Sequence, residues 1–229
     1  LSRQLITIVS FVSVVYMQVA CSPVERPWVD NEAPEDPGAP VYGGKIKLAY
    51  IGETNSWLPG KGNFAAAGLN VAAAIYDAFL MRDSEWQIRP YLAQSIIPNE
   101  DHSVWRMTLR PNVRFHDGTA LDAAAVKWNF DTLHKAPGTV TFGAVRDVDS
   151  VEIIDALTVD YHLTKSIVAF PDLLIGPVGW PFSPTAAARM GDDAGSYPVG
   201  TGPFRFVQWR RDDRIELQRN EDYWQAGLP

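Results

Sequence analysis

The sequence has 229 residues, enough for one large domain or two modest ones. Apolar residues make up 46% and charged residues 21%, a composition that supports a packed core and excludes a chain disordered throughout. The net charge is −7, from 20 basic and 27 acidic residues, and no block of lysine or arginine interrupts it, which excludes the clustered positive charge of a nucleic-acid-binding protein.

The chain begins with a segment that has the pattern of a secretion signal. An apolar run over residues 5–19 follows a single basic residue, and its length of about 15 residues is below the roughly 20 that span a bilayer. Ala20 and Cys21 come next, an order that resembles a bacterial lipoprotein cleavage site, although Gln18 stands where such sites usually have leucine. We predict a signal peptide over residues 1–20 and lipid attachment at Cys21. The alternative is an ordinary secretion signal, or a membrane anchor, with a bystander cysteine.

Cys21 is the only cysteine, so the chain has no internal disulfide framework and no multi-cysteine metal site.

The segment after Cys21 is proline-rich and acidic. Residues 22–40 contain five prolines and five acidic residues with almost nothing to bury. Such a segment stays extended and solvated. We therefore predict an acidic, proline-rich tether over residues 21–42, and a folded domain over residues 43–229.

The folded part is expected to open with a strand over residues 45–51, where apolar and polar residues alternate. A polar loop over residues 52–63 follows and contains Trp57. Ligand sites favour loops at the ends of strands in open α/β sheets. The alternative is a plain connector whose Trp57 folds back onto the core.

Further helices and strands are expected along the rest of the chain. Asp122 precedes an apolar helical face and is expected to cap that helix through its carboxylate. An Asp-Gly turn is expected at residues 117–118. The expected elements are a helix over 65–80, strands over 104–109 and 113–115, a hairpin of 148–154 with 157–163, short helices over 170–175 and 185–190, and a rigid loop over 176–184 that carries Trp180.

The stretch PVGTGPFRFVQW, residues 198–209, contains two glycines around a threonine. A phosphate-binding loop needs a lysine followed by serine or threonine and then a helix. This stretch has no lysine and leads into alternating residues, so we predict a strand, a turn at residues 211–213 and a second strand. The glycines are expected to allow the close approach of another chain segment.

No catalytic or metal-binding motif is evident. The four histidines show no metal-ligand spacing, no GxSxG motif is present, and the carboxylates are scattered. His116 and Asp117 are neighbours, but side chains of neighbouring strand residues point to opposite faces. Paired-carboxylate catalysis stays open, yet the simplest interpretation is a protein that binds without catalysing, with no cofactor and no metal ligand.

One region has the order of motifs of a known family. RPYLAQSIIPNEDHSVWRMTLRPNVRFHDGTALDAAAVKWNFDTL, residues 89–133, resembles the signature region of extracellular solute-binding protein family 5, the peptide-, dipeptide- and nickel-type binding components of ABC importers. PVGTGPFRFVQW and RNEDYW, residues 219–224, resemble further family hallmarks in the same order. Ala125 departs from the pattern, because the family helix often carries an acid there.

The resemblance implies an α/β fold of the periplasmic-binding-protein type (type II), in which two lobes close on a ligand. RNEDYW normally precedes the crossover into the second lobe, so the sequence is interpreted as a truncated chain with only the first lobe substantially present. Strand edges that would receive later segments are then expected to be uncovered.

The resemblance also implies a function and a site. We expect an extracytoplasmic, lipid-anchored solute receptor that delivers oligopeptides or a similar small solute to an ABC permease, with His116 and Asp117 as scaffold residues. The alternatives are a solute sensor without transport, a nickel or metal-chelate binding protein, and a surface glycosidase. The expected ligand-binding residues are Glu53, Thr54, Asn55, Ser56, Trp57 and Trp180.

Overall fold

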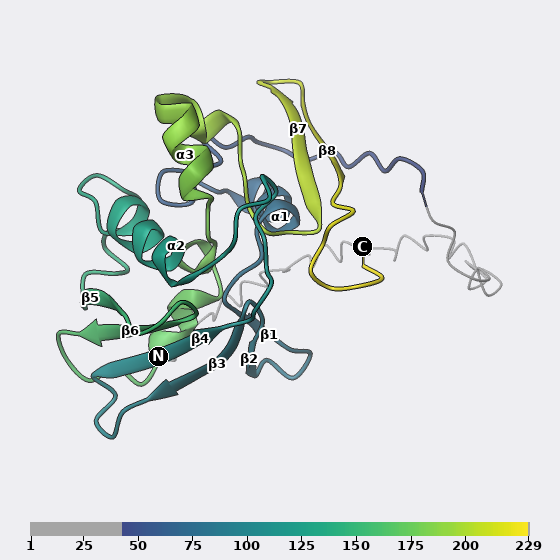
Figure 1. Cartoon of the computed structure of the whole chain (residues 1–229). Coiled ribbons are helices and arrows are strands. Elements are labelled where there is room, and N and C mark those ends of the chain that lie inside the picture. The colour runs from purple at the N-terminus through teal and green to yellow at the C-terminus, as the bar shows by residue number, and fades with distance from the viewer. Residues whose placement is uncertain (1–42, 229) are drawn as a thin grey trace, which may run out of the picture. The chain divides into compact units, whose positions relative to one another are not determined.

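The computed structural model describes residues 43–228, and the expected signal peptide, Cys21 and the whole of the expected tether over residues 21–42 lie outside them. The chain divides into two compact units, Leu1–Lys47 and Leu48–Pro229. The second unit contains all the described helices and strands (Figure 1).

The second unit mixes short helices with antiparallel strands. Its elements in chain order are α1 (Ala66–Ile75), β1 (Leu80–Arg82), β2 (Ile88–Pro90), β3 (Ala93–Pro98), β4 (Val104–Leu109), α2 (Ala123–Trp128), the π-helix η1 (Asn129–His134), β5 (Val148–Ile153), β6 (Thr158–Leu163), the 3-10 helices η2 (Phe170–Leu174) and η3 (Pro177–Gly179), α3 (Pro184–Met190), the 3-10 helix η4 (Gly191–Ser196), β7 (Phe204–Arg210) and β8 (Arg214–Arg219).

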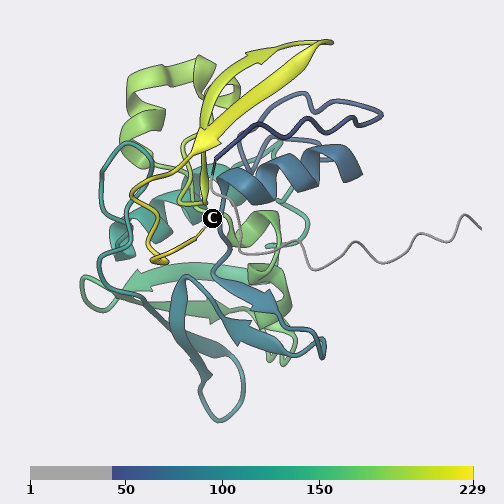
Figure 2. The same cartoon turned by 90° about the vertical axis from the view of Figure 1, so that its right-hand side faces the viewer.

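A four-stranded antiparallel sheet in the order β3-β4-β6-β5 forms one side of the hydrophobic core. Helix α2 packs on β5 and β6, and Figure 2 shows this layer from the side. The β4 residues Met107 and Leu109 and the β6 residue Val159 are fully buried. Two further pairs, β1-β2 and β7-β8, complete the strands, and the β7-β8 hairpin lies beside α1 in both views.

Several local predictions are confirmed. Asp122 caps α2, because its Oδ1 accepts a hydrogen bond of 2.8 Å from the backbone N–H of Ala125. The predicted hairpin corresponds to β5 and β6. The Asp-Gly turn is also present, since Gly118 has φ +83° and donates its N–H to the carbonyl of Phe115. The strand–turn–strand prediction for the chain end corresponds to β7 and β8.

Three predicted elements are wrong or too long. Residues 45–51 form no strand, because no described strand supplies the hydrogen-bonding partners that an extended segment needs, and Ile46 and Leu48 are exposed. The helix predicted to residue 80 ends at Ile75, because Tyr76 has an extended backbone and the Ile75 carbonyl accepts from the N–H of the distant Gly202. The strand predicted at residues 113–115 is reduced to a single bridge between Arg114 and Ala120.

The glycines of the 198–209 stretch allow the close contact that the sequence predicts. Gly202 donates its N–H to the carbonyl of Ile75 at 2.8 Å, at the C-terminal end of α1. A Cβ on Gly200 would lie 2.3 Å from the same carbonyl oxygen, and one on Gly202 would lie 2.6 Å from the carbonyl carbon of Ile75. Both positions therefore exclude any side chain.

The outer edge of the sheet at β5 is not bare. Lys127 donates its ammonium to the carbonyl of Val151 at 3.0 Å, and Lys135 donates to the carbonyl of Asp149. Two carbonyls of this edge strand are thus occupied by lysine side chains, a common protection of sheet edges. The uncovered edge expected from the sequence is not found at β5.

We predict that Gly200→Ala destabilises the fold by roughly 2–3 kcal/mol, because the new methyl group collides with backbone at the end of α1. Urea-induced unfolding measures this change. Gly143→Ala is the matched control, since a Cβ there meets nothing within 4 Å, and its effect is expected to stay within about 0.5 kcal/mol. Equal effects at the two positions would contradict the close-approach interpretation.

Candidate ligand-binding site

The loop over residues 53–57 is shaped by its own side chains. The hydroxyl of Thr54 donates to the carbonyl of Ser56 at 2.8 Å, and the Ser56 hydroxyl accepts from the N–H of Leu58 at 3.2 Å. The Oδ1 atom of Asn55 accepts from the N–H of Asn63 at 2.7 Å. Local side-chain bonds of this kind replace the ladder hydrogen bonds of regular structure, so the loop keeps a defined shape without being helix or strand.

Trp57 fastens this loop to two distant segments. Its backbone N–H donates to the carbonyl of Gly195 in η4 at 2.8 Å, and its carbonyl accepts from the buried Tyr76 hydroxyl at 2.8 Å. The Trp57 side chain is only 3% exposed. Of the two alternatives that the sequence left open, the ring has folded back onto the core, while Glu53 and Asn55 of the same loop are exposed.

Five aromatic rings form one cluster beneath the loop, which brings the two predicted tryptophans together. Phe64 lies 6.3 Å from Trp57 and 5.6 Å from Trp180 between ring centroids. Tyr76 stacks on Trp180 at 6.0 Å with an interplanar angle of 10°. Trp209 meets Trp57 edge-to-face at 5.6 Å. Trp57 and Trp180 therefore belong to one aromatic cluster, in which Phe64 joins their rings.

The turn of the β7-β8 hairpin supplies contacts that the sequence did not reveal. The indole N–H of Trp209 donates to Oε1 of Glu53 at 2.6 Å, and the backbone N–H of Asp212 lies 3.3 Å from each carboxylate oxygen. Arg211 lies over the Trp209 ring at 4.1 Å and donates to the carbonyl of Asn55 at 3.3 Å. These residues are more than 150 positions from Glu53 in sequence, and we found no local pattern that links them.

A second buried cluster surrounds Asp77, directly after α1. Trp224 donates its indole N–H to Oδ2 of Asp77 at 2.7 Å, and Tyr223 donates its hydroxyl to Oδ1 at 3.2 Å. The hydroxyls of Tyr91 and Tyr223 are 2.9 Å apart, and the Arg110 guanidinium lies over the Trp224 ring at 5.5 Å. The RNEDYW motif thus contributes two donors that hold the chain end against the segment after α1.

Burial dominates the electrostatics of this second cluster. It raises the pKa of Asp77 to about 6, and the hydrogen bonds from Trp224 and Tyr223 oppose that rise without cancelling it.

The neighbouring residues His116 and Asp117 lie outside this cluster, and burial lowers the pKa of His116 to about 4. The His116 Nε2 atom lies 2.9 Å from the carbonyl of Gly202, whereas Asp117 accepts a bond of 2.6 Å from Ser183. The two neighbours therefore have separate partners, both within the scaffold.

No group of three or more possible metal ligands is present among residues 43–228. Within that same range, every helix is too short or too polar to cross a bilayer.

Comparison with protein families decides the classification. The model of the family described as "Bacterial extracellular solute-binding proteins, family 5 Middle" matches residues 87–229, more than half of the chain. The chain belongs to this family. The matched region includes the RNEDYW segment that holds Asp77 and the glycines that contact α1.

Individual relatives give the same result. The glutathione-binding protein GsiB of Pectobacterium atrosepticum is 32% identical over 192 residues, which cover 83% of this chain and 37% of that protein. The solved structure of AgaA of A. tumefaciens R10 in complex with agropinic acid matches with a TM-score of 0.70 and 27% identity, covering 77% of this chain and 36% of AgaA. NikZ of Campylobacter jejuni in complex with Ni(L-His) matches with a TM-score of 0.66 and 26% identity, covering 76% and 35%.

These matches confirm the fold class expected from the sequence, a mixed helix and sheet fold of the periplasmic-binding-protein type of which only part is present. This family member spans about a third of the length of the relatives it matches. The relatives bind solutes of different chemistry, so the ligand does not follow from family membership.

We predict that Asp77 makes the stability of the protein depend on pH. Its pKa is about 6 in the folded chain against an ordinary value of 3.8, so the folded chain binds this proton more tightly than the unfolded chain. The contribution of this proton to the free energy of unfolding is fully present below about pH 4 and is lost as the pH rises through about 6. The total loss is roughly 3 kcal/mol.

Urea-induced unfolding of the wild type and Asp77→Asn, at about pH 4.5 and about pH 7, isolates this contribution as the difference between the two proteins. Asp83→Asn is a contrasting control. The hydrogen bond from Arg89 lowers the pKa of Asp83, so the stability from Asp83 is lost as the pH falls. Parallel pH profiles for the wild type and Asp77→Asn would contradict the assignment.

Proposed function

We propose that this chain is part of the solute-receiving component of an ABC importer, which captures a peptide or a similar small solute and delivers it to the permease. The observation that carries the proposal is the family match over residues 87–229. Relatives whose names or complexes specify glutathione, agropinic acid and Ni(L-His) support a small polar solute.

The proposed contact region is the 53–57 loop above the aromatic cluster. Glu53 and Asn55 offer exposed polar groups, and Ser56 beside them is half-buried. Thr54, Trp57 and Trp180 are buried and support this region from beneath. A loop held by internal hydrogen bonds needs little reordering on binding, which reduces the entropic cost of complex formation.

The proposed mechanism makes and breaks no covalent bond. A ligand that binds the closed arrangement of two lobes more tightly than the open one shifts the population toward closure. The described residues supply one side of such a site. Delivery then requires a permease that recognises the closed state.

We further propose that Cys21 carries a lipid and that residues 22–42 tether the domain outside the membrane, after removal of residues 1–20. In a bacterial host that expresses the gene, Cys21→Ser is expected to abolish incorporation of an alkyne-labelled fatty acid and to release the protein from the membrane fraction. Retention of both label and membrane association by the variant would contradict lipid attachment at this residue.

A solute panel tests the binding function. The full-length protein is expected to be stabilised against heat by at least one member of a panel containing di- to pentapeptides, glutathione, opines, oligosaccharides and nickel–histidine, because a ligand of the folded state raises its apparent stability. Mass spectrometry of the same samples is expected to recover the solute unchanged. Turnover of any panel member would contradict a binding-only role, and so would the absence of binding to every member.

A further inference from the structure

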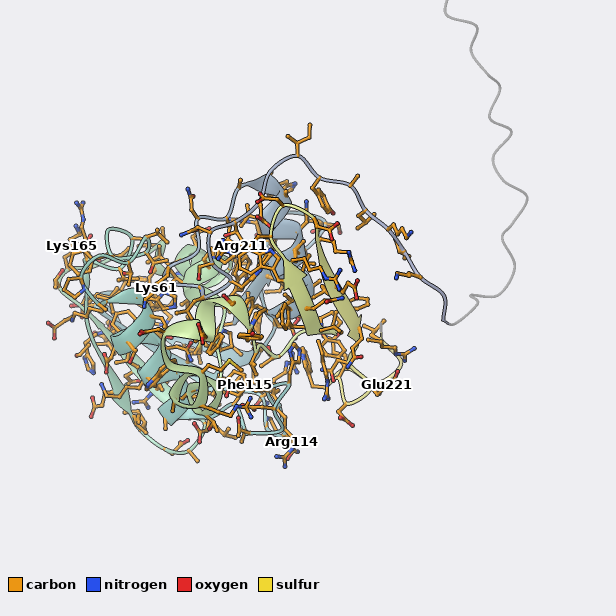
Figure 3. The ribbon with its side chains drawn as sticks, turned by 90° about the horizontal axis from the view of Figure 1, so that it is seen from above. Lys61, Arg114, Phe115, Lys165, Arg211 and Glu221 are labelled. Carbon is orange, nitrogen blue, oxygen red and sulfur yellow. The ribbon has the colours of Figure 1, made fainter. Side chains whose placement is uncertain are left out.

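Residues 221–228, called the strap below, follow β8 and meet the end of α1 at one cluster. Residues 221–222 and 226–228 are exposed, and only residues 223–225 are half-buried. Figure 3 shows Glu221, the first strap residue, at the end of the hairpin opposite the turn at Arg211. Tyr223 and Trp224 both donate to Asp77, so the buried polar contacts of the strap converge on one carboxyl group.

Asp77 is a buried carboxyl group without a basic partner. It is only 4% exposed, and the indole N–H of Trp224 lies 2.7 Å from its Oδ2 atom. Within the described part of the chain, no lysine, arginine or histidine forms an ion pair with it, and the side chains that act on it are neutral donors. The ionised form therefore bears a desolvation cost that no opposite charge offsets, whereas the protonated form does not.

Two tyrosine hydroxyls allow this cluster to accommodate a proton on Asp77. The Tyr223 hydroxyl lies 3.2 Å from Oδ1 of Asp77 and 2.9 Å from the Tyr91 hydroxyl, and either tyrosine can donate the second bond. A hydroxyl is both a donor and an acceptor. Tyr223 donates to Asp77 when the carboxyl is ionised; when it is protonated, the carboxyl donates to Tyr223 and Tyr223 donates to Tyr91. Neither state leaves a buried polar group unpaired.

The other charged groups near the cluster do not take over this role. Arg110, which follows β4, lies over the Trp224 ring at 5.5 Å. The two acids of the strap, Glu221 and Asp222, are exposed and pair with arginines of the β7-β8 hairpin. Exposed pairs are screened by solvent and contribute little to attachment. Ionisation of Asp77 is therefore the charge change that acts directly on the buried contacts of the strap.

We infer that Asp77, Tyr223 and Trp224 form a proton-dependent latch, in which protonation of Asp77 favours the attached strap and ionisation favours local detachment. Detachment exposes the carboxyl to water, where its charge is solvated, so the ionised form favours the detached state. The remaining helices and strands stay folded in both states. The latch is a property of the fold that goes beyond the proposed function and does not depend on it.

The pH range of the latch follows from the two states of Asp77. Its pKa is about 6 with the strap attached, and in the detached state we expect it near the ordinary value of 3.8. Because the attached state binds the proton more tightly, attachment is strongest below about pH 4 and weakens as the pH rises through about 6.

Hydrogen exchange of the full-length protein tests the latch, because it measures the opening of each segment separately. Protection factors of peptides from the strap and from β4 are compared between about pH 4.5 and about pH 7.5, without urea and in about 1 M urea. The variants are Asp77→Asn and Trp224→Phe. Asp222→Asn is the matched control, since Asp222 is also a strap carboxylate but is exposed and lies outside the cluster.

The wild-type strap is expected to lose protection roughly twenty- to thirtyfold from about pH 4.5 to about pH 7.5. Asp77→Asn cannot ionise, so its strap is expected to be equally protected at both pH values and better protected than the wild type at the higher one. Asp222→Asn is expected to follow the wild-type profile. Urea at about 1 M is expected to speed exchange in β4 but hardly in the strap, because local opening exposes little surface.

Trp224→Phe separates the latch from simple packing. It keeps an aromatic ring but removes the donor that favours the ionised carboxyl, so the midpoint of the pH profile is expected to move above about 6. Loss of packing alone would lower protection at every pH without moving the midpoint.

Other results overturn the latch. A wild-type strap whose protection is independent of pH has no such device. Equal pH profiles for the wild type and Asp77→Asn assign the effect to another group. An equal response of the strap and β4 to urea means that the strap opens only by global unfolding. If Asp77→Asn does not fold, Trp224→Phe decides, and an unchanged midpoint in that variant rejects the latch.

Discussion

The contact between two glycines and the end of α1 organises the described fold. Gly202 donates to the carbonyl of Ile75, and the carbonyls of Gly200 and Gly202 accept from His116, with Asn220 as a further donor to Gly202. Four segments far apart in sequence therefore meet at one short stretch of backbone. Because no side chain fits between the glycines and the helix end, this meeting point tolerates little variation.

The candidate site depends on that meeting point through α1. Tyr76, the residue after the helix, binds the carbonyl of Trp57 and stacks on Trp180. Asp77, one residue later, is held by the RNEDYW segment. The glycine contact thus sets the end of α1, the end of α1 sets the aromatic cluster, and the cluster supports the exposed loop and the hairpin turn beside it.

Local features of this chain were predictable from sequence, and long-range contacts were not. The cap at Asp122 and the β5-β6 hairpin depend on neighbouring residues and were identified. The early end of α1 and the missing strand at residues 45–51 depend on partners elsewhere, so periodicity gave the wrong answer. For the same reason the 53–57 loop could be suggested from the family resemblance, whereas Trp209 and Arg211 could be recognised only from their positions in space.

The lysines on β5 affect how this protein meets other protein chains. Ammonium groups of Lys127 and Lys135 occupy carbonyls that a foreign strand would need for pairing. A strand that approached this edge would have to displace two charged side chains and then compete with them for each oxygen. Self-association through sheet extension at β5 is therefore opposed by these two side chains.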